Sequence, residues 1–303
     1  MMRLYTAAET ARRLPYPALA ERLREALLER ARAQVPERLA VPLAARGVLL
    51  AMPAADPELA MTKLVTVHPD NAAQGLPTIQ GEVVALDART GVRLGVLDGA
   101  TVTGRRTAAL SLLAAQTLAP EPDGALLVVG AGVQARAHLE AFRAGLGTER
   151  VLVASRTQER AEALAAHARS LGMAAEVIRD PHDALGRVSL IVTATTSARP
   201  VLRAPLPERA MVCAVGAFRP EMAELSPELI AGASVVVDTL EGARSEAGDL
   251  IQAAAAGLWG WERATPLEAL LAGEAHPLPG PLVFKSVGHA LFDLAACHLA
   301  FGR

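Results

Sequence analysis

The chain has 303 residues, 51% of them hydrophobic and 20% charged, which excludes a disordered protein and provides enough apolar side chains for a substantial core. A formal net charge of -2 and 3% aromatic residues disfavour phosphate-backbone binding and base stacking, so no nucleic-acid partner is expected. The two cysteines lack metal-ligand spacing, and no metal site is predicted. Neither a signal peptide nor an apolar run long enough to cross a bilayer is present, so we expect a cytoplasmic protein without a membrane anchor.

The first part of the chain combines helical and extended patterns. Residues 17–34 carry apolar side chains at helical spacing behind Pro17, which predicts an amphipathic helix. Between residues 38 and 99, short apolar runs alternate with turn sequences, as is typical of antiparallel hairpins. Residues 104–119 return to a helical pattern, and the segment APEPDG that follows indicates a linker.

Beyond the linker, apolar strands alternate with helical stretches, which predicts a doubly wound parallel sheet of the Rossmann type in an α/β protein. Residues 286–299 form a last helical pattern, which we expect to pack on the first part of the chain. We therefore divide the sequence into one domain of residues 1–119 with 281–303 and a second of residues 120–280. The predicted strands are ALLVV, VLVA, AAEVI, SLIVTA, MVCAVG and SVVVD.

The strand ALLVV leads directly into a glycine-rich turn. Gly130, Gly132 and Ala135 match the pattern G-x-G-x-x-A between a predicted strand and a predicted helix. The first glycine permits the tight turn, and the second lets backbone N–H groups approach a pyrophosphate at the helix N-terminus. We predict that Gly130, Gly132, Val133 and Gln134 bind a dinucleotide. A glycine-rich turn without a ligand is the alternative.

The end of the next strand indicates which dinucleotide binds. NAD-binding chains usually carry an acid there for the ribose diol, but this sequence reads Ser155-Arg156-Thr157. Arg156 can pair with a 2′-phosphate, and the two hydroxyl side chains can add hydrogen bonds. We therefore predict NADP(H) as the preferred cofactor, with NAD(H) possible; a solvated surface arginine is the alternative.

Two further segments follow predicted strands of the same sheet. Thr195 and Thr196 come after the fourth strand, at the edge of the sheet where the carboxyl ends of parallel strands face the ligand. They are predicted to contact the nicotinamide ribose. An ordinary hydroxyl-rich turn is the alternative. Gly216, after the fifth strand, completes the predicted cofactor-binding residues.

Several strings in the sequence resemble the ornithine cyclodeaminase and mu-crystallin family. They occur in family order from about Arg38 to Asp293, which makes the match far more specific than the glycine-rich turn alone. The matching strings are MTKLVTVHPDNAAQGLPTIQG, LDGATVTGRRTAALS, VVGAGVQARAH, VTATTS, AVGAFRP, EAGDL and VFKSVG.

The resemblance implies a substrate-binding and dimerisation domain completed by the C-terminal helix, a Rossmann domain for NAD(P), and a homodimer. Family members deaminate and cyclise ornithine, dehydrogenate amino acids, or reduce cyclic ketimine carboxylates. By this resemblance, Lys63 matches the active-site lysine, Arg106 the carboxylate-binding arginine, and Arg38 a second carboxylate-binding arginine.

The sequence departs from the cyclodeaminases at two acidic positions. Phe218 stands where the resemblance places an aspartate, and Leu50 stands where it places a glutamate. In the cyclodeaminases both carboxylates act on amine groups. Their absence here therefore favours reduction of a preformed cyclic imine. On this interpretation the site contains two arginines and a lysine without an acidic partner. A carboxylate from a distant stretch beside the nicotinamide would remove the preference for a reductase over a lyase.

The predicted activity is NADPH-dependent reduction of 1-pyrroline-2-carboxylate or 1-piperideine-2-carboxylate to proline or pipecolate. Arg106 and Arg38 would clamp the substrate carboxylate, and Lys63 would contact that carboxylate or deliver a proton. The alternatives are an NAD-dependent ornithine cyclodeaminase, a non-catalytic NADPH-dependent binding protein of mu-crystallin type, and an alanine-type dehydrogenase. Lys63 and Arg106 could also be structural ion-pair partners.

Overall fold

A computed structural model describes residues 3–203 and 205–303. The chain divides into two compact units, Met1–Arg106 with Ala290–Arg303, and Thr107–His289. The division at the C-terminal side lies later than residue 281, where the sequence pattern placed it. The reason is β13 (Leu282–Lys285), which pairs with two strands of the second unit.

The first unit is built on an antiparallel sheet. Within the described residues, five strands follow one another in chain order from β1 to β5, as the hairpin pattern predicted. The helices and strands of this unit are α1 (Ala7–Arg13), α2 (Tyr16–Leu28), the 3-10 turn η1 (Arg30–Arg32), β1 (Leu39–Pro42), β2 (Val48–Ala55), β3 (Leu59–Val67), the 3-10 turn η2 (Pro69–Gln74), β4 (Ile79–Asp87), β5 (Arg93–Asp98) and α10 (Ala290–Phe301).

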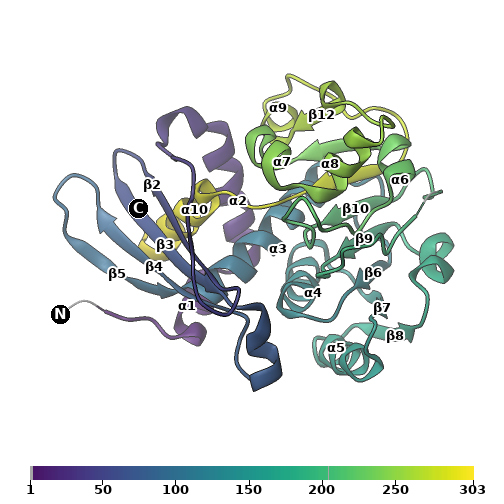
Figure 1. Cartoon of the computed structure of the whole chain (residues 1–303), viewed down its shortest axis with the longest axis horizontal. Helices are drawn as coiled ribbons and strands as arrows, with labels where there is room; N and C mark the ends of the chain where they lie inside the picture. The colour runs from purple at the N-terminus through teal and green to yellow at the C-terminus, as the bar shows by residue number, and fades with distance from the viewer. Residues whose placement is uncertain (1–2, 204) are drawn as a thin grey trace. The chain divides into compact units, whose positions relative to one another are not determined.

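The two faces of this sheet differ in burial. Along β3, Leu59, Met61, Lys63, Val65 and Val67 are buried and alternate with more exposed residues, so Lys63 lies on the apolar face. Helix α10 packs against β2, β3 and α2 (Figure 1). The expectation that the last helix completes the first domain is therefore confirmed.

Helix α3 (Gly99–Leu118) begins in the first unit and ends in the second. It starts earlier than the sequence pattern indicated, because the carboxylate of Asp98 accepts a hydrogen bond from the backbone N–H of Thr101 at 2.8 Å. Such an acceptor satisfies one of the free N–H groups at a helix start.

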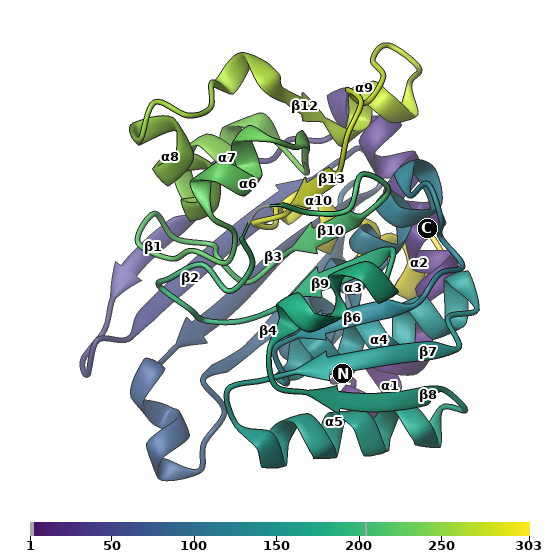
Figure 2. The same ribbon diagram turned by 90° about the vertical axis from the view of Figure 1, so that its right-hand side faces the viewer.

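The second unit contains a parallel sheet of the Rossmann type, as predicted. Its eight strands, counted over the described part of the chain, lie in the order β12-β11-β13-β10-β9-β6-β7-β8, and Figure 2 shows β10, β9, β6, β7 and β8 in succession. The elements after α3 are β6 (Leu126–Val129), α4 (Val133–Leu146), β7 (Arg150–Ala154), α5 (Gln158–Ser170), β8 (Ala174–Ile178), the 3-10 segment η3 (Pro181–Arg187), β9 (Leu190–Thr193), β10 (Met211–Ala214), α6 (Pro227–Ala231), β11 (Ser234–Val237), α7 (Leu240–Glu246), α8 (Gly248–Ala255), η4 (Trp261–Arg263), β12 (Ala264–Pro266), α9 (Leu267–Leu271) and β13.

The strand order reverses between β6 and β9. From β6 the chain proceeds outward through β7 and β8, and it then returns to the other side of β6 with β9 and β10. In open α/β sheets, ligands bind beyond the carboxyl ends of the strands at such a reversal. The segments that follow Val129 and Thr193 are therefore the expected ligand-binding edge of this unit.

Candidate functional site

A buried charged cluster lies on the apolar face of the first unit's sheet. The Nζ atom of Lys63 on β3 is 2.7 Å from Oδ2 of Asp293, which lies in the first turn of α10. The Nε atom of Arg106 on α3 is 3.4 Å from Oδ1 of the same carboxylate. Lys63 is 3% exposed, Arg106 6% and Asp293 0%, so these charges interact without screening by bulk water.

The electrostatics of the cluster centre on Lys63. Burial lowers the pKa of Lys63 to about 8, because removing the ammonium from water disfavours its charged form. The Asp293 carboxylate opposes this effect, whereas the positive charges of Arg106 and Arg38 add to it. Lys63 and Arg106 therefore share one carboxylate, and this pair of cations has positive charge left for an anionic ligand.

The two consecutive arginines of α3 have different partners. Arg105 donates a hydrogen bond from Nε to the carbonyl oxygen of Leu14 at 2.7 Å, and its guanidinium lies 3.8 Å from the ring centroid of Tyr16. Arg106 instead faces the carboxylate of Asp293. At 3.4 Å this contact is an ion pair without a hydrogen bond, and within the described chain Arg106 Nε and Asp293 Oδ1 have no hydrogen-bond partner. Buried polar atoms of this kind are typical of ligand sites.

Leu50 lies on the same face of the sheet as Lys63. It pairs with Val65 on β3, two residues from Lys63, and paired residues on neighbouring strands share a face. An apolar side chain thus occupies the face where the family resemblance placed a glutamate.

Asp293 is the functional residue that the sequence interpretation missed. That interpretation left Lys63 and the arginines without an acidic partner, and this point is wrong, because α10 brings a fully buried carboxylate to Lys63. A signal was available in the sequence, since a lone acid within the apolar run ALFDLAAC requires a buried partner.

In the second unit, the glycine-rich turn lies between β6 and α4, as predicted. Gly130 has a φ of +116°, and a Cβ there would come within 2.4 Å of the carbonyl oxygen of Ala194, so only glycine fits. Gly132 precedes the first turn of α4, and an added Cβ would meet no atom within 4 Å. Val133 is 73% exposed at this helix start. The N-terminal end of α4 is therefore open to an anionic group.

Ser155, Arg156 and Thr157 form the turn between β7 and α5. Thr157 is the residue before the first turn of α5, and its backbone N–H donates to the Ser155 hydroxyl at 3.4 Å. Arg156 is exposed and, in the described parts of the molecule, makes no ion pair. Its guanidinium is thus available to a ligand at the carboxyl end of β7.

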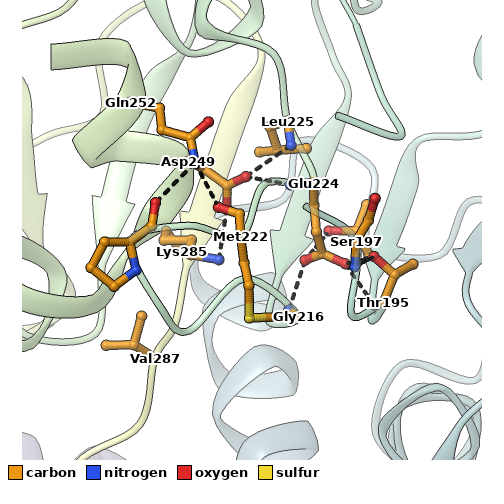
Figure 3. Close-up of polar contacts among 12 residues, drawn as sticks. Thr195, Ser197, Gly216, Met222, Glu224, Leu225, Asp249, Gln252, Lys285 and Val287 are labelled. Atoms are coloured by element: carbon orange, nitrogen blue, oxygen red, sulfur yellow. Dashed lines mark hydrogen bonds and ion pairs between the residues drawn. The ribbon is translucent and has the colours of Figure 1, made fainter. Parts of the chain in front are cut away.

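Thr195 and Gly216 are brought together by a residue that the sequence interpretation did not single out. Both donate backbone N–H groups to the carboxylate of Glu224, at 2.6 Å and 2.7 Å (Figure 3). No hydrogen bond of this kind joins Thr196 to Glu224 among the described residues. Burial raises the pKa of Glu224, although the positive charge of Lys285 opposes this. Phe218, which stands where the resemblance placed an aspartate, is partly buried in the same loop and lies beside the guanidinium of Arg219.

Two features are absent from the described residues. No group of three or more histidine, cysteine, aspartate or glutamate side chains lies close enough together to hold a metal ion. Likewise, among the helices of the described chain none is long and apolar enough to span a membrane.

The chain is similar to known proteins over nearly its full length. A model of the ornithine cyclodeaminase/mu-crystallin family matches residues 1–302. The chain is 44% identical over 301 residues to Delta(1)-pyrroline-2-carboxylate reductase 1 of Burkholderia multivorans, covering 98% of this chain and 94% of the relative. It is 42% identical over 300 residues to Delta(1)-pyrroline-2-carboxylate/Delta(1)-piperideine-2-carboxylate reductase of Azospirillum brasilense, with coverage of 98% and 94%.

A solved structure has the same fold. Delta(1)-pyrroline-2-carboxylate reductase of Thermococcus litoralis, in complex with NADH and L-proline, superposes with a TM-score of 0.88 at 27% sequence identity. The match covers 99% of this chain and 93% of that one, so the likeness includes both units.

Proposed function

Because the chain belongs to the ornithine cyclodeaminase/mu-crystallin family, as its sequence motifs predicted, we propose that it is a nicotinamide-dependent reductase of cyclic ketimine carboxylates. The proposed reaction converts 1-pyrroline-2-carboxylate to proline, and the six-membered homologue is a second candidate substrate. The observation that carries this proposal is the buried cluster of Lys63 and Arg106 around the single carboxylate of Asp293, with the positive charge of Arg38 near enough to act on Lys63. Its residual positive charge suits a small anion.

The substrate carboxylate would bind to this cluster. The guanidinium of Arg106 presents donors in a planar fork, which matches the two oxygens of a carboxylate, and Arg38 would add a second positive charge. Charge-assisted hydrogen bonds in a buried site hold the ligand in one orientation. Fixing the imine carbon in this way contributes to the rate, because the reacting atoms are already aligned.

Lys63 would supply the proton that the product requires. Reduction places a hydride on the imine carbon and leaves the ring nitrogen with one additional N–H bond. A reduced nicotinamide, when bound, would supply the hydride. With a pKa of about 8, the ammonium of Lys63 is protonated near neutral pH and acidic enough to donate, directly or through water. Asp293 would hold this ammonium in place through its 2.7 Å contact.

The same carboxylate is the feature that favours the second candidate, ornithine cyclodeamination. A cyclodeaminase needs a carboxylate able to take a proton from water or an amine. Asp293, however, is already the counter-ion of Lys63 and Arg106. With Leu50 and Phe218 at the two positions discussed above, we propose reduction as the main activity.

The arginine clamp can be tested with a matched pair of variants. Arg106→Lys keeps the charge but loses the planar fork, so KM for 1-pyrroline-2-carboxylate should rise roughly tenfold or more, as expected for the loss of a charge-assisted hydrogen bond. Arg105→Lys is the control, because Arg105 is bound to Leu14 and Tyr16. Loss of reduced-nicotinamide absorbance measures the rates. If neither the five- nor the six-membered imine is reduced, or ornithine releases ammonia faster, the proposed function is wrong.

We further propose that NADP(H) is the preferred cofactor, since Arg156 is exposed and available beside the Ser155 and Thr157 hydroxyl groups. The Thermococcus relative was solved with NADH, so the preference needs a direct measurement. Arg156→Ala should raise KM for NADPH roughly tenfold or more and leave KM for NADH unchanged. Arg160→Ala, an exposed arginine of α5, is the control. Equal loss with both cofactors would contradict the assignment.

We propose a homodimer formed through the other face of the antiparallel sheet. On that face Leu39, Val41 and Leu64 are 62%, 40% and 41% exposed, which is unusual for neighbouring large apolar side chains. Leu64→Glu should therefore give a monomer in light scattering. Val92→Glu, at an exposed apolar residue of the β4–β5 turn, should stay dimeric. A wild-type monomer would refute this proposal.

A further inference from the structure

Glu224 is a fully buried carboxylate with both oxygens occupied. Its Oε1 accepts hydrogen bonds from the backbone N–H and the hydroxyl of Thr195, at 2.6 Å and 2.9 Å. Its Oε2 accepts from the backbone N–H of Gly216 at 2.7 Å (Figure 3). The same oxygen accepts from the hydroxyl of Thr193 at 2.9 Å. Each oxygen thus receives one backbone donor and one hydroxyl donor.

These donors come from the ends of two neighbouring strands. Thr193 ends β9, and Gly216 follows β10, which runs parallel to β9. The glycine-rich turn touches the same region, because a Cβ on Gly130 would lie 2.4 Å from the carbonyl oxygen of Ala194. Glu224 therefore connects the segments after β9 and β10 at the edge of the sheet where a dinucleotide is expected.

The position of Glu224 is itself fixed by a buried ion pair. Oδ1 of Asp249 accepts the backbone N–H groups of Glu224 and Leu225 at 2.6 Å and 2.9 Å. Oδ2 of Asp249 lies 2.8 Å from Nζ of Lys285, and both side chains are 0% exposed. Lys285 ends β13, the parallel neighbour of β10 on its other side. The Glu224 carboxylate is therefore supported from three parallel strands.

We propose that Glu224 is a positioning residue for the cofactor, which holds the segments after β9 and β10 in the arrangement that binds the nicotinamide half of the dinucleotide. This inference rests on the proposed function only in assuming that the second unit binds a nicotinamide dinucleotide. Glu224 acts through Thr195 and Gly216 and need not touch the cofactor.

The hydrogen-bond pattern explains why a carboxylate is needed here. Glutamine has nearly the same shape, but one of its two terminal atoms is an NH2 group that cannot accept. Because Thr195 and Gly216 each direct a fixed backbone N–H at a different oxygen, either orientation of the amide sets two donors against each other. One buried N–H group loses its acceptor, and the segment that carries it is driven toward an open conformation.

The test compares Glu224→Gln with wild type by calorimetric titration of two kinds of probe. NADPH and NADH report on the whole site, whereas 5′-AMP and adenosine 2′,5′-bisphosphate report on the adenosine half alone. In the variant, affinity for the dinucleotides should fall about five- to hundredfold, because binding must first close the opened segment. Affinity for the adenosine probes should stay within about twofold.

A second variant keeps the test decisive if Glu224→Gln does not fold. Thr193→Val removes one hydroxyl donor without setting two donors against each other. It should weaken dinucleotide binding roughly two- to tenfold and leave the adenosine probes unaffected. Asp87→Asn is the matched control, because Asp87 organises the β4–β5 turn of the first unit through Arg89 and Thr90. It should lower the unfolding temperature without changing any affinity.

Two outcomes would overturn the inference. One is a folded Glu224→Gln protein that binds NADPH and NADH as tightly as wild type; the other is an equal loss for the dinucleotides and the adenosine probes. Failure of the proposed function has a different signature: the wild type would bind dinucleotide but reduce no cyclic imine, and the binding ratios would still decide the role of Glu224. A wild-type protein that binds no dinucleotide would overturn both the inference about Glu224 and the proposed function.

Discussion

The contact between Lys63 and Asp293 makes a quantitative prediction for the variant Asp293→Asn. Asparagine keeps the shape of the side chain and removes the charge that favours the protonated lysine. At the observed Nζ–Oδ2 distance of 2.7 Å, the Coulomb attraction is roughly 6 kcal/mol for an effective dielectric constant of about 20, which is an upper bound. Entry of water reduces this, and opposite charges at such distances change a protonation midpoint by about one to three pH units.

The assay is the pH profile of kcat/KM for 1-pyrroline-2-carboxylate, which reports ionisations of the free protein and free substrate. The proposed proton donor is active when charged, so wild-type activity should fall as the pH rises through the Lys63 pKa of about 8. In Asp293→Asn, Arg106 and Arg38 still repel the ammonium, so this fall should begin about one to three pH units lower.

The comparison removes the main ambiguity of such a profile. Ionisation of the imine substrate is the same for both proteins, so only the difference between the two curves is attributed to Lys63. Asp87→Asn, which changes a carboxylate of the β4–β5 turn, should reproduce the wild-type profile. If the alkaline side of the profile stays in place in Asp293→Asn, Asp293 does not control the protonation of Lys63, and the proposed role of this pair is refuted.

Three further predictions follow from buried groups and close approaches. Gly132→Ala should keep the unfolding temperature within about 2 °C of wild type, because the added Cβ meets no atom within 4 Å. The same variant should weaken dinucleotide binding roughly tenfold or more, because the methyl group obstructs the pyrophosphate. Calorimetry measures both quantities, and unchanged binding would argue against the glycine-rich turn as the binding site. Burial lowers the pKa of His138 to about 4, below its ordinary 6.5, so its contribution to stability is complete above pH 6.5 and is lost as the pH falls toward 4. His138→Asn does not titrate, so the stability difference from wild type in urea unfolding should shrink by about 2.5 kcal/mol between pH 7 and pH 4.5; a constant difference would contradict this. Burial raises the pKa of Cys213 to about 12 and also raises the pKa of Cys297. Neither thiol should therefore react with a disulfide reagent at pH 8 until urea unfolds the protein. Reaction of either thiol in the native protein would be inconsistent with the core packing.

Local patterns in the sequence were sufficient for most of the fold. The alternation in MTKLVTV placed Lys63 on the buried face of a strand, and the strand-turn-helix context identified Gly130 and Gly132. Each of these features is determined by residues within one or two turns of the chain.

What the sequence did not reveal are pairings between distant residues. Asp293 and Lys63 lie on different elements at opposite ends of the chain, and nothing near either residue specifies the other. Glu224 is a single acid between Ala223 and Leu225, with no spacing that marks it as an acceptor of four hydrogen bonds. The division at residue 281 placed β13 with the first domain, whereas β13 pairs with β10 and β11 of the second unit; parallel pairing leaves no local signature in the sequence.

The place of β13 in the interior of its sheet affects how the protein folds during synthesis. While a ribosome is still translating the preceding residues, the parallel sheet has a gap between β10 and β11 that only residues 282–285 can fill. The nascent antiparallel sheet likewise waits for α10, and with it for the counter-ion of Lys63. Neither unit can finish before the other has nearly been made, so long-range contacts close late. We therefore expect nascent chains of this protein to expose apolar strands for most of their synthesis and to depend on chaperones during that period.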